Sequence, residues 1–363
     1  MVQRGNPGAL PVLMCALLAM LTLSACTSPQ YYAQAVHGQV SLMLARRAVD
    51  DVLADQTISP DVRSRLALAR DARVFAHEQL GLPDNGSYQS YVELHRPYVV
   101  WNVFAAPPYS FELRQSCFLI VGCLAYRGYF SEAAARRHAA RLEARGDDVF
   151  VGGVTAYSSL GWFADPLLSS MLRWDEVTLV RTLFHELAHQ WFYLPGDTTF
   201  NESFAMAVAE VGLARWWRRH HPAAPLPEDT AHEEAFVALT LEYRDKLAQV
   251  YASTLPESEK RARKAEILSA LREEFSRRSQ DWPEAADYTR WLAEDLNNAK
   301  LASVATYHTW VPAFRTLLIR LNEDLSRFHA AVLELGQLPP AARERALQAL
   351  MPTPVAGPQS APP

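Results

Sequence analysis

The feature that most constrains the fold is a helical segment that carries the pattern His-x-x-x-His with a glutamate after the first histidine. His185, Glu186 and His189 form this pattern. Apolar side chains recur at every fourth position, the spacing of one buried helical face: Leu179, Leu183, Leu187 and Trp191. Histidines four residues apart project from one side of a helix, about one turn apart. The segment therefore predicts a helix that offers both imidazoles to one metal ion.

A second segment offers a third ligand. Glu202 lies thirteen residues after His189, in Asn201-Glu202-Ser203-Phe204-Ala205, where a second helix is predicted to begin. Pro195-Gly196-Asp197 predicts a turn between the two helices, so an antiparallel pair can bring Glu202 to the histidines. Two histidines and a glutamate suit a tetrahedral Zn²⁺ that keeps one open position. We expect one Zn²⁺ per chain, with Glu186 as general base toward a zinc-activated water.

Longer stretches resemble known proteins. HELAHQWF followed by NESFA is similar to the gluzincin metallopeptidases of the aminopeptidase N type, whose zinc helix is followed by NEGFA with glutamate as third ligand. Nearly the whole mature chain resembles the bacterial family of putative aminopeptidase lipoproteins, through YYAQAVHGQ, LHRPYVVWNVFAAP, GCLAYRGYF, GGVTAYSSLGWF and LNNAKLASVATYHTWVP. The resemblance implies a gluzincin-like fold and a zinc peptidase, by name an aminopeptidase, that acts on peptides.

The resemblance also implies a substrate-binding edge strand. In gluzincins a sheet edge beside the cleft binds the substrate backbone by strand addition. The corresponding residues here are Gly152, Gly153, Val154, Thr155 and Ala156. The two glycines permit close backbone approach, or they mark a bulge without functional meaning.

Aminopeptidase N enzymes carry on this strand a glutamate that binds the free amino group of the substrate. Here no acidic residue occurs between Gly152 and Phe163. Asp165, Asp175 and Glu176 are alternative anionic anchors, although ordinary loop and helix-cap roles explain them equally well.

Peptide hydrolysis also needs a donor that stabilises the oxyanion. Gluzincins take it from the helical part after the zinc helices, and Tyr307 and Tyr243 are the candidates here. Tyr307 comes first because its segment is apolar and is expected to pack beside the cleft, but both could be core residues with satisfied hydroxyls. Glu210 could accept a hydrogen bond from a ligating imidazole, or it could be a surface carboxylate near Arg215.

The N-terminus is predicted to be an export signal. Arg4 precedes an apolar run, Ala9 to Leu23, that is too short for a membrane-spanning helix. Leu23-Ser24-Ala25-Cys26 resembles a bacterial lipobox, which implies cleavage before Cys26 and a lipid on that residue. An ordinary signal peptide or an uncleaved anchor is the alternative. We expect a lipid-anchored, periplasm-facing protein of the bacterial cell envelope, and Thr27 favours the outer membrane.

Two cysteines remain once the signal and Cys26 are set aside. Cys117 and Cys123 are predicted to form a disulfide, because an exported protein meets an oxidising compartment. An extended strand would separate their Cα atoms by about 20 Å, far beyond the reach of a disulfide. The bridge therefore requires a chain reversal, expected at Gly122.

Composition bounds the remaining organisation. The 363 residues are 49% hydrophobic and 21% charged, which suits a globular protein with a sizeable core. The net charge of −5, without a strongly basic domain, argues against a nucleic-acid partner. No pattern indicates an oligomeric state.

The predicted fold class is α+β and mainly helical, with a small mixed β-sheet before the zinc helices and a helical C-terminal part. A first helix is expected over 31–54, and strands over 98–106, 117–130 and 148–158. The predicted organisation is a signal peptide (1–25), one metallopeptidase domain (26–351) made of helices plus sheet (26–174), zinc helices (175–221) and a helical lobe (222–351), and a disordered tail (352–363).

Two other classes of function stay open. One is a catalytically silent zinc lipoprotein that binds envelope peptides or partner proteins, and that would hold metal without turnover. The other is a structural helical lipoprotein in which HELAH is incidental, and that would not retain stoichiometric zinc.

Overall fold

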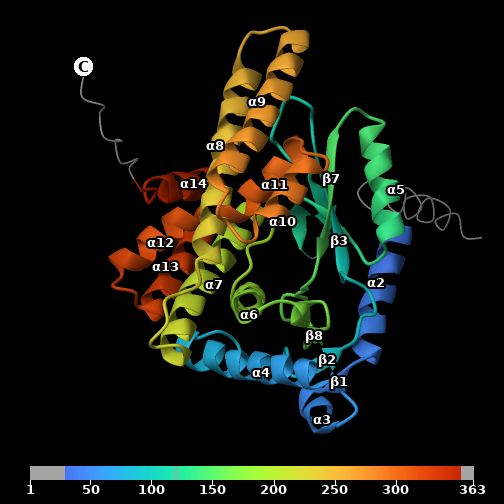
Figure 1. The fold of residues 1–363 in the computed structure, drawn as a ribbon, viewed down its shortest axis with the longest axis vertical. Helices are drawn as coiled ribbons and strands as arrows, with labels where there is room; N and C mark the ends of the chain where they lie inside the picture. The colour runs from blue at the N-terminus through green and yellow to red at the C-terminus, as the bar shows by residue number, and fades with distance from the viewer. Residues whose placement is uncertain (1–28, 119–120, 353–363) are drawn as a thin grey trace, which may run out of the picture.

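A computed structural model describes residues 29–118 and 121–352. The predicted signal peptide, Cys26 and residues 353–363 of the predicted tail lie outside these residues. Figure 1 shows the helices, which are α2 (Pro29–Leu44), α3 (Val49–Ala54), α4 (Pro60–Leu80), α5 (Glu132–Glu143), the short 3₁₀ helix η1 (Met171–Arg173), α6 (Glu176–Trp191), α7 (Thr198–His220), α8 (Asp229–Ala252), α9 (Glu257–Arg278), α10 (Ala285–Ala293), α11 (Asn298–His308), α12 (Val311–Arg320), α13 (Leu325–Gln337) and α14 (Pro340–Gln348).

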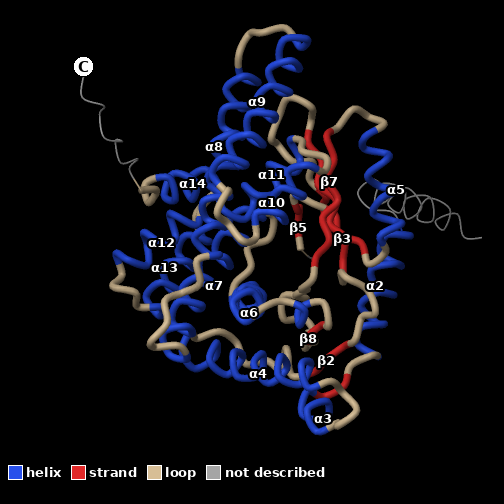
Figure 2. The backbone as a smooth tube through the Cα atoms, viewed as in Figure 1, coloured by secondary structure: helices blue, strands red, loops and turns tan. Residues whose placement is uncertain are grey.

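The strands are short and form separate sheets (Figure 2). They are β1 (Arg47–Ala48), β2 (Ser90–Val92), β3 (Val100–Ala106), β4 (Ser116–Phe118), β5 (Gly122–Leu124), β6 (Arg127–Tyr129), β7 (Asp148–Val154) and β8 (Leu167–Leu168). The prediction of an α+β, mainly helical chain is confirmed. The prediction of one mixed sheet is wrong, because the described residues form an antiparallel sheet β6-β3-β7, a mixed sheet β1-β2-β8 and a β4-β5 hairpin.

Helices cover both faces of the β6-β3-β7 sheet. Every residue of β3 is buried, which is the pattern of a strand packed on both sides. Trp101, Val103 and Ala105 pack with α5, whereas Phe104 and Ala106 pack with α11. The sheet is thus held between an early and a late helix of the chain (Figure 1).

The largest core lies around α6 and α7, which pack against each other and against α4. Asp175 caps the start of α6 by accepting a hydrogen bond from the Thr178 amide at 2.8 Å, and Asp197 caps α7 in the same way. The crossing of the helices is tight at Gly212 of α7, where an added Cβ would lie 2.6 Å from the Phe184 ring of α6.

The α8–α9 pair projects from the body of the molecule, at the top of Figure 1, and has a hydrophobic cluster of its own. That cluster includes Tyr243.

The first predicted helix is wrong as a single element. The chain leaves the helix after Leu44, and Arg47 and Ala48 pair with Tyr91 and Ser90 before α3 begins. Strand pairing with a distant segment therefore interrupts a helical apolar pattern.

Within residues 29–118 and 121–352, no helix combines the length and the apolar character that a bilayer crossing needs.

Candidate metal centre

The connection between α6 and α7 places the third ligand. Asn201 holds this connection through its side-chain amide, which donates to the Leu194 carbonyl and accepts from the Leu194 amide, each at 2.8 Å. Asp197, the cap of α7, is further fixed by Arg343 of α14 at 2.8 Å. The next residue after Asn201 is Glu202, whose carboxylate consequently faces α6.

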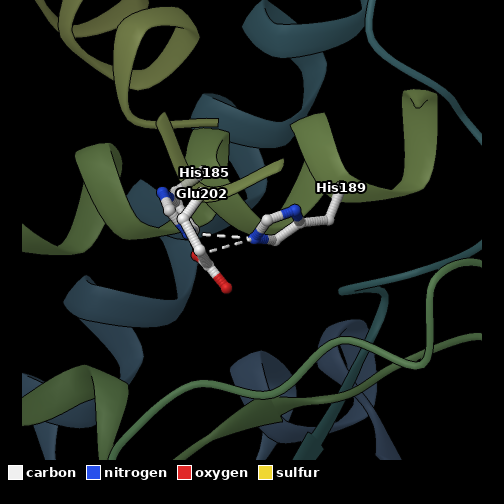
Figure 3. A group of neighbouring side chains, drawn as sticks. All are labelled: His185, His189 and Glu202. Carbon is white, nitrogen blue, oxygen red and sulfur yellow. Dashed lines mark hydrogen bonds and ion pairs between the residues drawn. The ribbon is translucent and has the colours of Figure 1, made fainter. Parts of the chain in front are cut away.

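Three potential ligand atoms converge at this point (Figure 3). His185 Nε2 and His189 Nε2 lie 3.1 Å apart, and the Glu202 Oε2 lies 3.2 Å from the first and 3.3 Å from the second. A tetrahedral ion with bonds of about 2.0–2.1 Å sets its ligand atoms about 3.4 Å apart. The three residues expose at most 9% of their area. Their donor set and spacing fit a metal ion.

The pKa values of the three residues are shifted by their burial and by one another's charges. Burial lowers the pKa of His185, which keeps it neutral as a ligand must be. Burial also opposes charge on Glu202, but the two histidines outweigh it and lower the pKa of Glu202 to about 2. Burial opposes charge on His189 as well, yet the carboxylates of Glu202 and Glu186 raise its pKa. The negative charge of Glu202 and the positive charge that it favours on His189 therefore stabilise each other within one buried site.

Glu186 lies beside these ligands on α6. Burial raises the pKa of its carboxyl to about 7, and the nearby charges of Glu202 and Asp165 act in the same direction while His189 opposes them. A carboxyl that changes charge near neutral pH can both accept and return a proton.

The model of the protein family described as "Putative aminopeptidase" matches residues 30–347. The chain belongs to this family. No curated protein and no solved structure matches it. The matched region runs from α2 into α14 and therefore includes α6 and α7, the two helices of the candidate metal centre.

The candidate metal centre opens into a cavity of about 860 Å³, which we call the metal cavity. Besides His185, Glu186, His189 and Glu202, the polar side chains that line it include Asn102, Tyr126, Tyr157, Arg181, Tyr193, Glu233, Tyr307 and His308. A volume of this size accommodates a small peptide segment.

Tyr307 lies in this cavity. Its ring stacks against His185, with centroids 6.2 Å apart and an angle of 26° between the planes. Burial, with the nearby charges of Glu202 and Glu186, raises the pKa of Tyr307 well above its usual value, so the hydroxyl keeps its proton. Tyr243, the other candidate, is 7% exposed and belongs to the core of the α8–α9 pair.

Tyr126 is a cavity residue that sequence reasoning missed. It follows β5, lines the cavity, and has a pKa raised by burial and by the Glu202 charge. The sequence around Tyr126 gives no sign of this role beyond the stretch GCLAYRGYF. Tyr126 reaches the cavity only because the β4-β5 hairpin packs against the connection between α6 and α7.

β7 is an edge strand, because within the described residues it pairs only with β3. Gly153 and Val154 of β7 line the metal cavity, as do Thr155 and Ala156, which follow the strand. Gly152 instead lines a neighbouring cavity of about 500 Å³. At Gly153 an added Cβ would overlap the ring of Tyr98, so packing within the protein accounts for this glycine.

The anionic anchors considered from the sequence have other partners. Asp175 caps α6, and Glu176 accepts hydrogen bonds from Trp216 at 2.8 Å and His221 at 3.0 Å. Asp165 is fully buried and accepts from the Ser159 amide at 2.7 Å. None of the three lines the metal cavity.

Another carboxylate, that of Glu233, does line the metal cavity. Glu233 of α8 forms an ion pair with Arg181, which lies one turn before His185 on α6. Glu186, Glu202 and Glu233 are the acidic residues among the described residues that line the cavity. Sequence reasoning missed Glu233 because 52 residues separate it from Arg181.

Glu210 is not a partner of the ligating imidazoles. Its carboxylate accepts from Arg315 Nε at 2.8 Å. The Nδ1 atoms of His185 and His189 have no hydrogen-bond partner among the described residues. The interpretation of Glu210 as their acceptor is wrong because an arginine from α12 takes its place.

Cys117 and Cys123 are joined in a disulfide, directly opposite each other in the β4-β5 hairpin. Gly122 has a φ of 75°, a conformation that favours glycine. An added Cβ at Gly122 would lie 2.9 Å from the amide nitrogen of Gly196, in the turn between α6 and α7. The hairpin therefore packs directly on the connection that positions Glu202.

Proposed function

We propose that the protein is a zinc-dependent peptidase of the gluzincin type that removes residues from the amino end of peptides. The observation that carries the proposal is the convergence of His185, His189 and Glu202 in one cavity, with Glu186 beside them. Membership of the aminopeptidase family supports the same reaction class.

When bound, zinc would polarise the peptide carbonyl and acidify the attacking water. Glu186 accepts the proton of that water and returns it to the leaving nitrogen. This role follows from its place next to the first histidine, on the helix that supplies two ligands.

Tyr307 is proposed to stabilise the developing oxyanion. Its ring lies against the His185 ring, and no hydrogen bond within the described residues occupies its hydroxyl. A donor that is already fixed in a water-poor cavity stabilises new negative charge without costly reorganisation. Tyr126, in the same cavity, is the comparison residue.

Glu233 is proposed to bind the free α-ammonium group of the substrate. Of the acidic residues that line the cavity, Glu202 is proposed to bind the metal and Glu186 to transfer the proton. Glu233 is therefore the remaining carboxylate that can bind the ammonium group. Its side chain is 29% exposed and can share its two oxygens between Arg181 and an incoming ammonium. The substrate backbone is proposed to lie along Gly153 to Ala156.

We further propose that Cys26 carries a lipid that holds the protein on the periplasmic side of the outer membrane. The lipobox-like segment before Cys26 supports this location.

Metal content and cleavage of a mixed peptide library test the function, with the parent protein compared with Glu186→Gln. This substitution removes the base but keeps the three ligands, so we expect one zinc in both and products only from the parent. The new termini in the products distinguish removal of N-terminal residues from internal cleavage. Zinc in both proteins without products from either would favour a silent binding protein, and absence of zinc from the parent would refute the metal centre.

A further inference from the structure

One row of exposed side chains on α2 is apolar from the first turn of the helix to its end. Tyr32, Val36, Val40 and Leu44 expose 36%, 62%, 48% and 82% of their areas. Their spacing of four residues places them in one row, which we name the apolar stripe. No Asp, Glu, Lys or Arg occurs in α2, so no charge interrupts this row.

The opposite face of α2 is fixed to the protein. The ring of Tyr31 packs against those of Phe118 and Tyr129, and Leu42 belongs to the main core. Gly38 is so close to Phe130 that an added Cβ would overlap its ring. The helix therefore cannot rotate to bury the apolar stripe against its own chain.

Single exposed apolar residues are ordinary on protein surfaces, whereas a continuous uncharged row indicates a binding surface. Figure 1 shows α2 along the outer edge of the molecule, away from α12, α13 and α14. The chain before α2 indicates what covers the row. The predicted cleavage makes the lipobox-like Cys26 the first residue of the mature chain, three residues before the helix begins at Pro29.

We propose that α2 lies on the surface of the lipid bilayer, with the apolar stripe inserted among the acyl chains. Three residues span at most about 10 Å, so a lipid on Cys26 would keep the first turn of α2 at the level of the headgroups. A helix of 16 residues is about 24 Å long and can lie in this interface, where apolar faces insert about 5–10 Å deep.

The arrangement has a consequence for access to the metal cavity. Tyr31 and Ala35, on the inner side of α2, line that cavity. A bilayer against the apolar stripe therefore lies one helix away from the cavity, which favours peptides held close to the membrane surface.

The test uses the full-length, lipidated protein in vesicles of phosphatidylethanolamine and phosphatidylglycerol. A fluorescent label that reports polarity is attached to Val36→Cys or Val40→Cys. Ser41→Cys is the matched control, because Ser41 is exposed on the same helix but lies about 100° round the axis from Val40. Glu266→Cys, on exposed α9, is the distant control. An unchanged midpoint of denaturant unfolding shows that each labelled protein is folded.

We expect lipids with brominated acyl chains to quench the labels at 36 and 40 at least threefold more than the labels at 41 and 266. An aqueous quencher should show the reverse order. Equal quenching at all four positions would overturn the proposal, as would protein that does not stay with the vesicles. Shielding that disappears when the protein is diluted in lipid would also overturn it, because it would assign the apolar stripe to a second copy of the chain. None of these outcomes depends on peptide hydrolysis.

Discussion

Replacing Glu233 by Gln tests the proposal that this carboxylate binds the amino terminus of the substrate. The substitution keeps the size of the side chain but removes the charge proposed to bind the α-ammonium group. A hydrogen bond to a charged group contributes about 1.5–3 kcal/mol. Because about 1.4 kcal/mol corresponds to a tenfold change in rate, kcat/KM for peptides with a free amino terminus should fall about 10- to 100-fold. The Arg181 guanidinium, left without its partner, would repel the substrate ammonium and favours the upper part of this range.

The assay compares matched peptides with free and N-acetylated termini. Acetylation removes the positive charge, so Glu233→Gln should leave the slow cleavage of acetylated peptides within about twofold of the parent value. Glu234→Gln is the control, because Glu234 is the next residue on α8 and pairs with Arg315 at 2.5 Å, yet it does not line the metal cavity. Equal losses on both peptides would show that Glu233 acts only by holding Arg181, and no loss on either would show that the ammonium binds elsewhere.

Three further changes probe separate parts of the structure. Tyr307→Phe should lower kcat about 10²- to 10³-fold with little change in KM if its hydroxyl stabilises the oxyanion, and a larger loss in Tyr126→Phe would transfer the role to that residue. Burial raises the pKa of Asp165 from its ordinary value of 3.8 to about 6, so between these pH values the carboxyl ionises more readily in the unfolded chain than in the folded protein. The stability of the parent should therefore fall between about pH 4 and pH 6, and Asp165→Asn should exceed it by about 3 kcal/mol at pH 7.5 but not at pH 4, which denaturant unfolding at both pH values measures. Gly212→Ala should lower the free energy of unfolding by about 1–3 kcal/mol, because its Cβ would meet Phe184 at 2.6 Å and Leu80 at 2.7 Å; an unchanged midpoint would contradict the packing described at this crossing.

The metal helices could be predicted from the sequence because their determinants are local. The spacing of His185 and His189 fixes one helical face, and a turn signal followed by Glu202 fixes the return of the chain. Each inference needs fewer than twenty consecutive residues, and no distant segment overrides it.

The rest of the site could not be predicted in this way, because it depends on contacts between distant segments. Glu233 reaches the cavity only through the packing of α8, and Arg315 of α12 takes Glu210 away from the imidazoles. Tyr243 and Tyr307 both lie on helices, and only tertiary packing separates a core residue from a cavity residue.

The prediction of one continuous helix over 31–54 was wrong for the same reason. The apolar spacing continues beyond Leu44, but pairing of Arg47 and Ala48 with β2 provides an alternative that local periodicity does not report. The spacing of apolar residues along the chain contains no information about a strand that pairs from about forty residues away.

The β4-β5 hairpin makes the geometry of the candidate metal centre dependent on the disulfide between Cys117 and Cys123. Tyr193 donates a hydrogen bond to the Val121 carbonyl at 3.1 Å, and the Ala125 amide donates to Thr198 at 3.2 Å, so the hairpin contacts both ends of the connection between α6 and α7. With the disulfide intact, these contacts are presented by a short closed loop. A reducing compartment would open that loop and loosen the connection that positions Glu202. If the protein has the function proposed above, it would bind zinc less firmly where thiols stay reduced, and its peptidase activity would be confined to oxidising surroundings.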